Sequence, residues 1–241
     1  MINVLSIGNS YSSDAHTYIH PIAKADGVEL NTVNLYIGGC SLYMHYVNML
    51  SGEKCYALEV NGTNTRFNVS LKEALLNRNW DVITLQQASF LSVNYSEYQP
   101  YLNELAAFVR RMVPKAKLSI HQTWAYEQGS VHLNNLDGYI NQKDMFNDLK
   151  NAYDKAASDI NADFIIPSGA VFQDLLESGI EKVHRDGSHA SLGCGRYALG
   201  LLWYKMITGN CIDKNSFSLF DEEITPSQIQ IVKSCVNKIE A

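Results

Sequence analysis

The chain has 241 residues and a formal net charge of −6, with 46% hydrophobic and 18% charged residues. This length fits one α/β domain, and the composition is that of a globular protein. The acidic balance argues against a nucleic-acid partner and against binding to anionic membranes, because nothing offsets the repulsion by phosphate groups.

The cysteines and the first residues of the chain give information on the cellular compartment of the protein. Five cysteines at irregular spacing, without a Cys-x-x-Cys motif, favour free thiols, and a Cys211–Cys235 bridge stays open for an exported protein. No run of about 18 apolar residues predicts a transmembrane segment. No signal peptide precedes the apolar run that begins at Ile2. We therefore expect a cytoplasmic protein as the sequence is written, or a periplasmic or secreted one if a signal peptide was removed.

Apolar runs and helical patterns alternate along the chain, which is typical of a parallel sheet with helices on both faces. The expected strands cover residues 2–7, 29–37, 81–85, 117–121 and 163–166. The expected helices cover residues 14–25, 71–77, 98–112, 143–160 and 169–176, and another begins near residue 192. The first of these helices is expected to be capped by Asp14. These patterns predict a five-stranded parallel sheet in a single domain spanning residues 1–241.

Two segments depart from this alternation. Residues 56–69 carry Asn61-Gly62 between two stretches of alternating polarity, which predicts a hairpin insertion. Residues 128–142 are polar and rich in asparagine, which predicts a loop at the carboxyl edge of the sheet.

Candidate functional residues follow the ends of four predicted strands. They are Ser10, Gly39, Gln86 and Trp124. In an open parallel sheet, ligands bind beyond the carboxyl ends of the strands. This convergence predicts a site at that edge.

Ser10 is the candidate nucleophile. It follows the first strand in Gly8-Asn9-Ser10-Tyr11-Ser12, where Gly8 permits a sharp turn. A helix that begins here would place partial positive charge beside the hydroxyl group. Two alternatives stay open at this point: Ser10 is only a turn or cap residue, or Ser12 or Ser13 takes its place.

Asp186 and His189 are the candidate acid–base pair. They are three residues apart, and Gly187 between them favours a turn that directs both side chains the same way. The imidazole would take the serine proton, and the carboxylate would orient the imidazole. The alternatives are a helix-capping Asp186 beside an unrelated exposed histidine, and His184 as the base.

Three groups are candidates for an oxyanion hole: the backbone N–H groups of Ser10 and Gly39, and the side-chain amide of Gln86. Gln87 is the alternative to Gln86, and a plain turn is the alternative at Gly39. Trp124 and Tyr126 follow the fourth strand and are candidates for a substrate-binding wall.

No metal or cofactor is expected. His16 and His20 are four residues apart on a predicted helix, but no third ligand is spaced to match them. The dinucleotide fingerprint Gly-x-Gly-x-x-Gly does not follow the first strand.

These motifs resemble those of the SGNH (GDSL-like) hydrolase superfamily over nearly the whole chain. Ser10 matches the first block, with Asn9 where the family usually has Asp, and Gly39 matches the second block. Asp186 and His189 match the last block, an Asp-x-x-His. The third block departs, because Leu85-Gln86-Gln87-Ala88-Ser89 replaces the usual Gly-x-Asn-Asp.

The resemblance implies a flavodoxin-like, three-layer α/β/α fold and ester hydrolysis without a cofactor. The glutamine in the third block is similar to some carbohydrate acetylesterase branches, which implies a small-molecule or glycan ester as substrate. We therefore expect a serine esterase acting on short acyl esters, with acetyl as the favoured group. The alternatives are a non-catalytic carbohydrate-binding protein on the same fold and a lipase or thioesterase of the same superfamily. The oligomeric state stays open.

Overall fold

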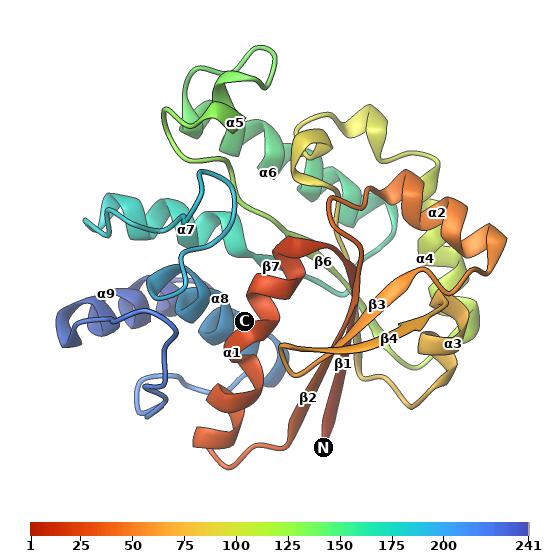
Figure 1. The fold of residues 1–241 in the computed structure, drawn as a ribbon, viewed down its shortest axis with the longest axis horizontal. Helices are drawn as coiled ribbons and strands as arrows, with labels where there is room; N and C mark the ends of the chain where they lie inside the picture. The colour runs from red at the N-terminus through yellow and green to blue at the C-terminus, as the bar shows by residue number, and fades with distance from the viewer. Residues whose placement is uncertain (241) are drawn as a thin grey trace.

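The computed structural model describes residues 1–240, and its seven strands form one sheet between two layers of helices (Figure 1). The strands are β1 (Ile2–Gly8), β2 (Leu30–Tyr36), β3 (Tyr56–Val60), β4 (Thr63–Val69), β5 (Val82–Leu85), β6 (Lys117–Gln122) and β7 (Phe164–Pro167). The α-helices are α1 (Ser10–Ala25), α2 (Leu42–Ser51), α3 (Leu71–Leu76), α4 (Tyr101–Met112), α5 (Val131–Asn134), α6 (Gln142–Asp159), α7 (Ser168–Glu177), α8 (Cys194–Thr208) and α9 (Pro226–Asn237). Two 3-10 helices are η1 (Ser89–Leu91) and η2 (Tyr95–Glu97).

The sheet has the strand order β4-β3-β2-β1-β5-β6-β7, with β1 at its centre. The five strands from β2 to β7 in this order run parallel, which confirms the flavodoxin-like α/β arrangement. The sheet has seven strands and not the five predicted, because β3 and β4 join it as an antiparallel pair. Strand β3 pairs with the outer edge of β2, from Val33 opposite Val60 to Tyr36 opposite Ala57. This pairing covers backbone groups that would otherwise form an open edge.

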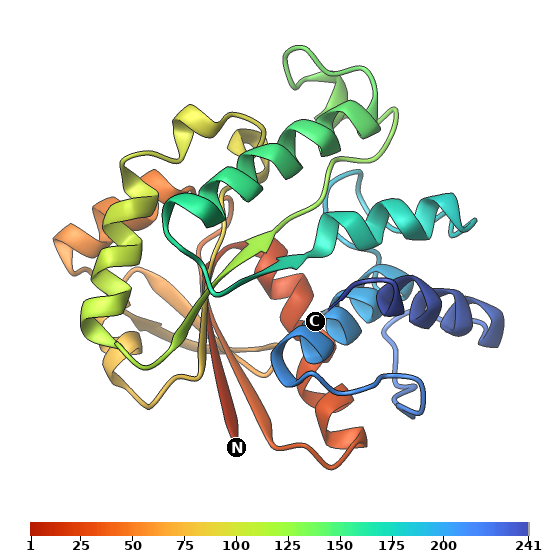
Figure 2. The same cartoon turned by 180° about the vertical axis from the view of Figure 1, so that it is seen from behind.

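Alternation along the central strand divides the core into two clusters. Val4 packs into one cluster, and its neighbours Leu5 and Ile7 pack into the other. Helices α1, α7, α8 and α9 cover the first face, and α2, α3, α4 and α6 cover the second (Figures 1 and 2). Both faces of the parallel strands are therefore buried, as their continuous apolar sequences predict.

Helix α1 begins four residues earlier than predicted. Asn9 caps it, with its side-chain oxygen accepting a hydrogen bond from the Tyr11 N–H group at 3.0 Å. Asp14 is not the cap, and its side chain lies buried inside the helix. Gly8 precedes the cap, where an added Cβ would lie 2.1 Å from Ser12 Oγ. Only glycine fits at this junction, which places Ser10 in the first turn of the helix.

Helices α2 and α9 were not predicted, and the polar loop at residues 128–142 contains the short helix α5. All five cysteines are free thiols, so Cys211 and Cys235 do not pair in this structure. No helix within residues 1–240 combines the length and the hydropathy needed to cross a membrane.

Three histidines are fully enclosed by the two core clusters. Burial lowers the pKa of His16, His45 and His121 to about 3 each. Each ring makes a hydrogen bond through a nitrogen: His16 with Ser6, His45 with Tyr56, and His121 with Gln86. The folded protein therefore holds three neutral imidazoles that the unfolded chain protonates near pH 6.5.

Because these imidazoles stay neutral in the folded protein, we predict that its stability falls as the pH is lowered. Between pH 6.5 and pH 3 the unfolded chain binds protons that the folded chain does not, so the free energy of unfolding falls as the pH falls. Each histidine contributes a slope of about 1.4 kcal/mol per pH unit across this window. Urea denaturation at intervals from pH 7.5 to 5 measures this slope. In the His45→Gln variant this slope should be smaller by about 1.4 kcal/mol per pH unit. An unchanged slope in that variant would contradict the assignment.

Candidate active site

Ser10 and His189 meet although 178 residues separate them in the sequence. Ser10 Oγ lies 2.9 Å from His189 Nε2, and His189 Nδ1 lies 2.8 Å from Asp186 Oδ2. Because the carboxylate accepts a hydrogen bond from Nδ1–H, Nε2 is left unprotonated as an acceptor for the serine hydroxyl. The three side chains are thus in the order that nucleophilic catalysis requires.

Hydrogen bonds from its own loop keep the Asp186 carboxylate ionised. Burial alone would raise its pKa, but hydrogen bonds from the backbone and ring of His189 and from the Ser188 N–H group lower the pKa to about 2. The two backbone bonds, at 2.8 Å and 3.1 Å, both end on Oδ1 and leave Oδ2 for the ring. Gly187 completes the turn with a φ of 83°. The carboxylate therefore stays charged at every physiological pH.

The other candidates for nucleophile and base are occupied elsewhere. Ser12 is fully buried, and its hydroxyl lies 2.8 Å from Asn34 Oδ1. His184 is buried, its Nε2 lies 3.0 Å from the Ala125 carbonyl oxygen, and burial lowers its pKa to about 4. Neither side chain lines the cleft beside Ser10.

An open cleft of about 830 Å³ surrounds Ser10 and His189. Its walls come from the carboxyl ends of β1, β2, β5 and β6 and from the loop that carries His189. None of the lining residues is Asp, Glu, Lys or Arg, and six of them carry an aromatic or imidazole ring. The lining comprises Asn9, Ser10, Tyr11, Tyr36, Gly38, Gly39, Ser89, Phe90, Tyr126, His132, Ser188 and His189.

Trp124 is not part of this wall, which corrects the expectation from the sequence. Its side chain has no exposed surface and stacks between Tyr11, at 4.2 Å between ring centroids, and Phe172, at 4.7 Å. Its indole N–H donates to the carbonyl oxygen of Ser188, the residue before His189, at 2.8 Å. Trp124 therefore supports the histidine loop from below. Tyr126 does line the cleft, with its hydroxyl 2.9 Å from Ser89 Oγ.

In the described part of the chain, two residues that line the cleft, Ser10 and Gly39, have unbonded backbone N–H groups. Within residues 1–240, neither the Ser10 nor the Gly39 N–H group has a hydrogen-bond acceptor. Gly39 has a φ of 63°, a left-handed conformation that favours glycine. The Asn9 amide links the two segments, because its Nδ2 donates to the Cys40 carbonyl oxygen at 3.1 Å.

Gln86 lies behind Asn9, not in the cleft. Its Nε2 donates to Asn9 Oδ1 at 2.7 Å, and its Oε1 accepts a hydrogen bond from His121 Nδ1 at 2.9 Å. The side chain is only 2% exposed. Gln87 is also buried, with its Oε1 accepting from the Leu42 N–H group at 3.0 Å. The structure thus gives the Gln86 amide a partner other than a bound substrate.

The sequence did not single out Tyr36, Phe90 or His132 as cleft residues. Tyr36 is the last residue of β2, and Phe90 lies in η1 after β5. His132 lies in α5, inside the polar loop after β6. The rule that pointed to Ser10 and Gly39, proximity to a strand's carboxyl end, would have found the first two.

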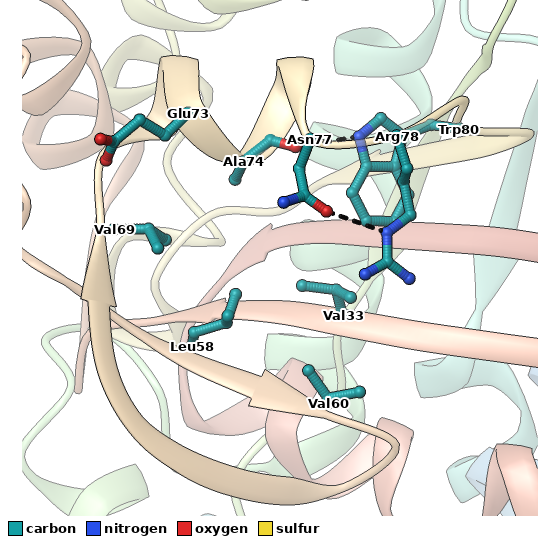
Figure 3. A pocket seen from close by; sticks show the side chains of 9 residues that line it. All are labelled: Val33, Leu58, Val60, Val69, Glu73, Ala74, Asn77, Arg78 and Trp80. Atoms are coloured by element: carbon teal, nitrogen blue, oxygen red, sulfur yellow. Dashed lines mark hydrogen bonds between the residues drawn. The ribbon is translucent and has the colours of Figure 1, made fainter.

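A second cavity, of about 430 Å³, lies between the β3–β4 hairpin and α3 (Figure 3). Val33, Leu58, Val60 and Val69 face it from three strands, and Trp80 closes one side (Figure 3). Its lining contains no serine, cysteine, histidine or tyrosine. It has no hydroxyl, thiol or imidazole group, so the candidate site for a serine nucleophile is the cleft at Ser10.

The two helical histidines do not face a common ligand. His16 Nε2 lies 2.8 Å from Ser6 Oγ, and His20 Nδ1 lies 2.7 Å from the Leu30 carbonyl oxygen. No cluster of three or more potential metal ligands occurs in the part of the chain that the structure describes.

The family model DUF4886, a domain of unknown function, matches residues 3–238. The chain belongs to the DUF4886 family. A crystal structure of a DUF4886 family protein from Bacteroides uniformis is 34% identical, covers 98% of this chain and 93% of its own, and has a TM-score of 0.92. A comparison with curated protein sequences finds no match.

More distant structures share the fold of this DUF4886 chain. A lipase/acylhydrolase from Enterococcus faecalis is 14% identical, with a TM-score of 0.54 and coverage of 87% of this chain and 96% of its own. A GDSL-like lipase from Bacteroides thetaiotaomicron is 12% identical, with a TM-score of 0.53 and coverage of 86% and 88%. The DUF4886 chain therefore has the fold of GDSL-like lipases and acylhydrolases.

The buried position of Gln86 predicts that its removal destabilises the DUF4886 fold. Gln86→Leu keeps a similar volume but leaves His121 Nδ1–H without its acceptor and Asn9 Oδ1 with one donor fewer. We expect a loss of about 1–3 kcal/mol in the free energy of unfolding, measured by urea denaturation. Tyr36→Phe, which removes a cleft hydroxyl, should stay within about 0.5 kcal/mol of wild type. Equal stability of Gln86→Leu and Tyr36→Phe would show that the Gln86 amide is free.

Proposed function

We propose that this protein is a serine esterase with Ser10 as its nucleophile. The observation that carries the proposal is the continuous hydrogen-bonded series from Ser10 Oγ through the His189 ring to Asp186, at 2.9 Å and 2.8 Å. The open cleft around Ser10 and the fold shared with lipases and acylhydrolases support it. In this proposal, residues 1–241 form one catalytic domain.

The proposed reaction has two steps. His189 Nε2 takes the proton of Ser10 as Oγ attacks the ester carbonyl carbon, and the imidazolium then protonates the leaving alcohol. Water, deprotonated by the same ring, attacks the acyl-serine and releases the carboxylic acid. Asp186 holds the ring in its Nδ1–H tautomer and stabilises the imidazolium.

The negative oxygen of each tetrahedral intermediate needs hydrogen-bond donors. The N–H groups of Ser10 and Gly39 fit this role, since both are unbonded and Ser10 begins helix α1. We assign Gln86 a supporting role, because its amide fixes Asn9 and Asn9 connects Ser10 to the Gly39–Cys40 turn. This replaces a direct contact of Gln86 with the oxyanion.

The cleft favours a neutral, polar substrate. Its lining has no Asp, Glu, Lys or Arg, and it combines serine hydroxyl groups with the rings of Tyr36, Phe90 and Tyr126. Flat aromatic walls with hydroxyl donors suit a sugar ring. We therefore propose a short-chain acyl ester, with acetyl as the favoured group, of a carbohydrate.

Replacement of the nucleophile tests the function directly. Ser10→Ala should lower the rate of p-nitrophenyl acetate hydrolysis by about 10³-fold or more, since the acyl-enzyme can no longer form. Ser13→Ala, which changes the serine three residues after Ser10, should keep the wild-type rate. A serine-directed organophosphonate should add to Ser10, as identified by mass spectrometry. Equal turnover by wild type and Ser10→Ala, or glycan binding without turnover in both, would rule the esterase out.

A second candidate substrate is favoured by the surface of α2. Four large hydrophobic side chains of this helix are exposed: Tyr43, Met44, Val47 and Leu50. The helix begins three residues after Gly39, and Phe90, which lines the cleft, is 50% exposed. A longer acyl chain leaving the cleft on this side would cover an apolar face of α2.

A series of p-nitrophenyl esters from acetyl to dodecanoyl separates the two candidates. If the substrate is a short-chain ester, kcat/KM should be highest for acetyl and fall by about tenfold or more at octanoyl. If α2 binds the acyl chain, kcat/KM should rise with chain length, and Val47→Asp should remove the rise without changing acetyl turnover.

A further inference from the structure

Asp14 is a buried carboxylate one helical turn after Ser10. Its side chain is 2% exposed, and both oxygens accept hydrogen bonds. A buried charge of this kind costs several kcal/mol unless it is paired and hydrogen-bonded. Two guanidinium groups and one backbone N–H group supply that pairing.

The partners of Asp14 lie on both sides of the acid–base pair. Arg185, which precedes Asp186, places Nη1 2.8 Å from Oδ2, and the N–H group of Ala190, which follows His189, donates to the same oxygen at 3.0 Å. Arg185 Nη1 also donates to the Ala190 carbonyl oxygen at 2.5 Å. The Arg185 N–H group donates to the His189 carbonyl oxygen at 3.0 Å. Residues 185–190 thus form a closed loop whose two ends share one carboxylate.

We propose that Asp14 is a positioning residue that sets the distance between Ser10 and His189. Ser10 and Asp14 belong to the same rigid helix, so a loop attached to Asp14 at both ends presents His189 at a fixed place relative to the serine. This rests on the proposed function, in which the two side chains exchange a proton. Asp14 contacts neither substrate nor the reacting atoms.

The third partner of Asp14 provides a matched control. Arg196, in α8, lies 2.9 Å from Oδ1 through Nε, and its Nη1 pairs with Asp221. Neither contact reaches residues 185–190. Loss of Arg196 removes one guanidinium partner of Asp14 but leaves both attachments to the histidine loop, whereas loss of Arg185 breaks the attachment at one end of that loop.

Three variants test the proposal: Asp14→Asn, Arg185→Met and Arg196→Met. The amide in Asp14→Asn replaces one acceptor with a donor, so it cannot hold all three partners. We expect kcat for p-nitrophenyl acetate to fall by about 10–100-fold in Asp14→Asn and Arg185→Met, with KM within about threefold, because misplaced reacting groups cost rate more than binding. Arg196→Met should keep kcat within about threefold, whatever its effect on Tm.

Two outcomes would overturn the proposal. One is a wild-type kcat in folded Asp14→Asn or Arg185→Met, with only Tm lowered. The other is an equal loss of kcat in Arg185→Met and Arg196→Met, which would indicate a general loss of packing. Arg185→Met keeps the test decisive if Asp14→Asn does not fold.

A measurement without substrate separates this proposal from the esterase itself. The His189 Nδ1 proton, bonded to Asp186, should give a downfield signal in the proton NMR spectrum, assigned by its loss in His189→Gln. That signal should shift or broaden in Asp14→Asn and Arg185→Met and stay in place in Arg196→Met. If the wild type hydrolyses no ester, the function is refuted, and this signal still decides whether Asp14 positions the ring. An unchanged signal in the first two variants would refute the positioning role.

Discussion

The contact between the Ser10 hydroxyl and the His189 ring depends on groups that do not enter the cleft. The serine is fixed by its place at the start of α1, directly after the central strand of the sheet. The histidine lies on a loop outside the helices and strands, so its position depends on contacts of that loop with itself and with the rest of the fold. Asp14 holds the ends of that loop, and Trp124 holds its middle through the Ser188 carbonyl oxygen. The geometry of the site is therefore a property of the first helix and of the core beneath it.

A series of buried polar side chains lies under the serine, and the donor and acceptor of each hydrogen bond in it are fixed. The series begins with Ser168, which is hydrogen-bonded to His121. His121 is in turn bonded to the Gln86 side-chain oxygen, and the Gln86 Nε2 donates to Asn9 Oδ1. Because the side-chain Oδ1 of Asn9 accepts hydrogen bonds from Gln86 and Tyr11, the Asn9 Nδ2 is directed to the Cys40 carbonyl oxygen. Each amide in the series can point only one way. Such a network gives a single arrangement at the serine, at the cost of placing polar atoms in the core.

Much of the fold and of the candidate site follows from local sequence. The apolar runs located all five parallel strands, and Gly8-Asn9-Ser10 with Asp186 and His189 identified side chains that the structure brings together. These signals are local, because they depend on strand ends and turn residues. The start of α1 was misplaced, since Asn9 and Asp14 are both good cap residues and only the contacts with the 185–190 loop show that Asp14 faces inward.

Other features require the folded chain. Trp124 and Tyr126 are two residues apart and equally aromatic, yet only Tyr126 reaches the cleft, because Tyr11 and Phe172 enclose Trp124 from helices far away in the sequence. The direction of the Gln86 amide depends on His121, another distant residue. The attachment of the β3–β4 hairpin to β2 is likewise a tertiary outcome, since a hairpin sequence does not reveal which edge it will pair with.

All seven strands end by Pro167, and Asp186 and His189 come after them. The sheet and the Asp186–His189 pair thus occupy separate stretches of the chain, whereas Ser10 directly follows the first strand. A substitution at the junction of β1 and α1 affects the sheet and the candidate site together, because Gly8 ends the strand, Asn9 caps the helix and Ser10 is the proposed nucleophile. Substitutions between residues 186 and 189 would, under the proposed function, change the proton transfer and leave every strand of the sheet unaltered. Relatives that have lost or changed the acid–base pair can therefore inherit the same architecture intact, which gives this fold a simple route to diversification.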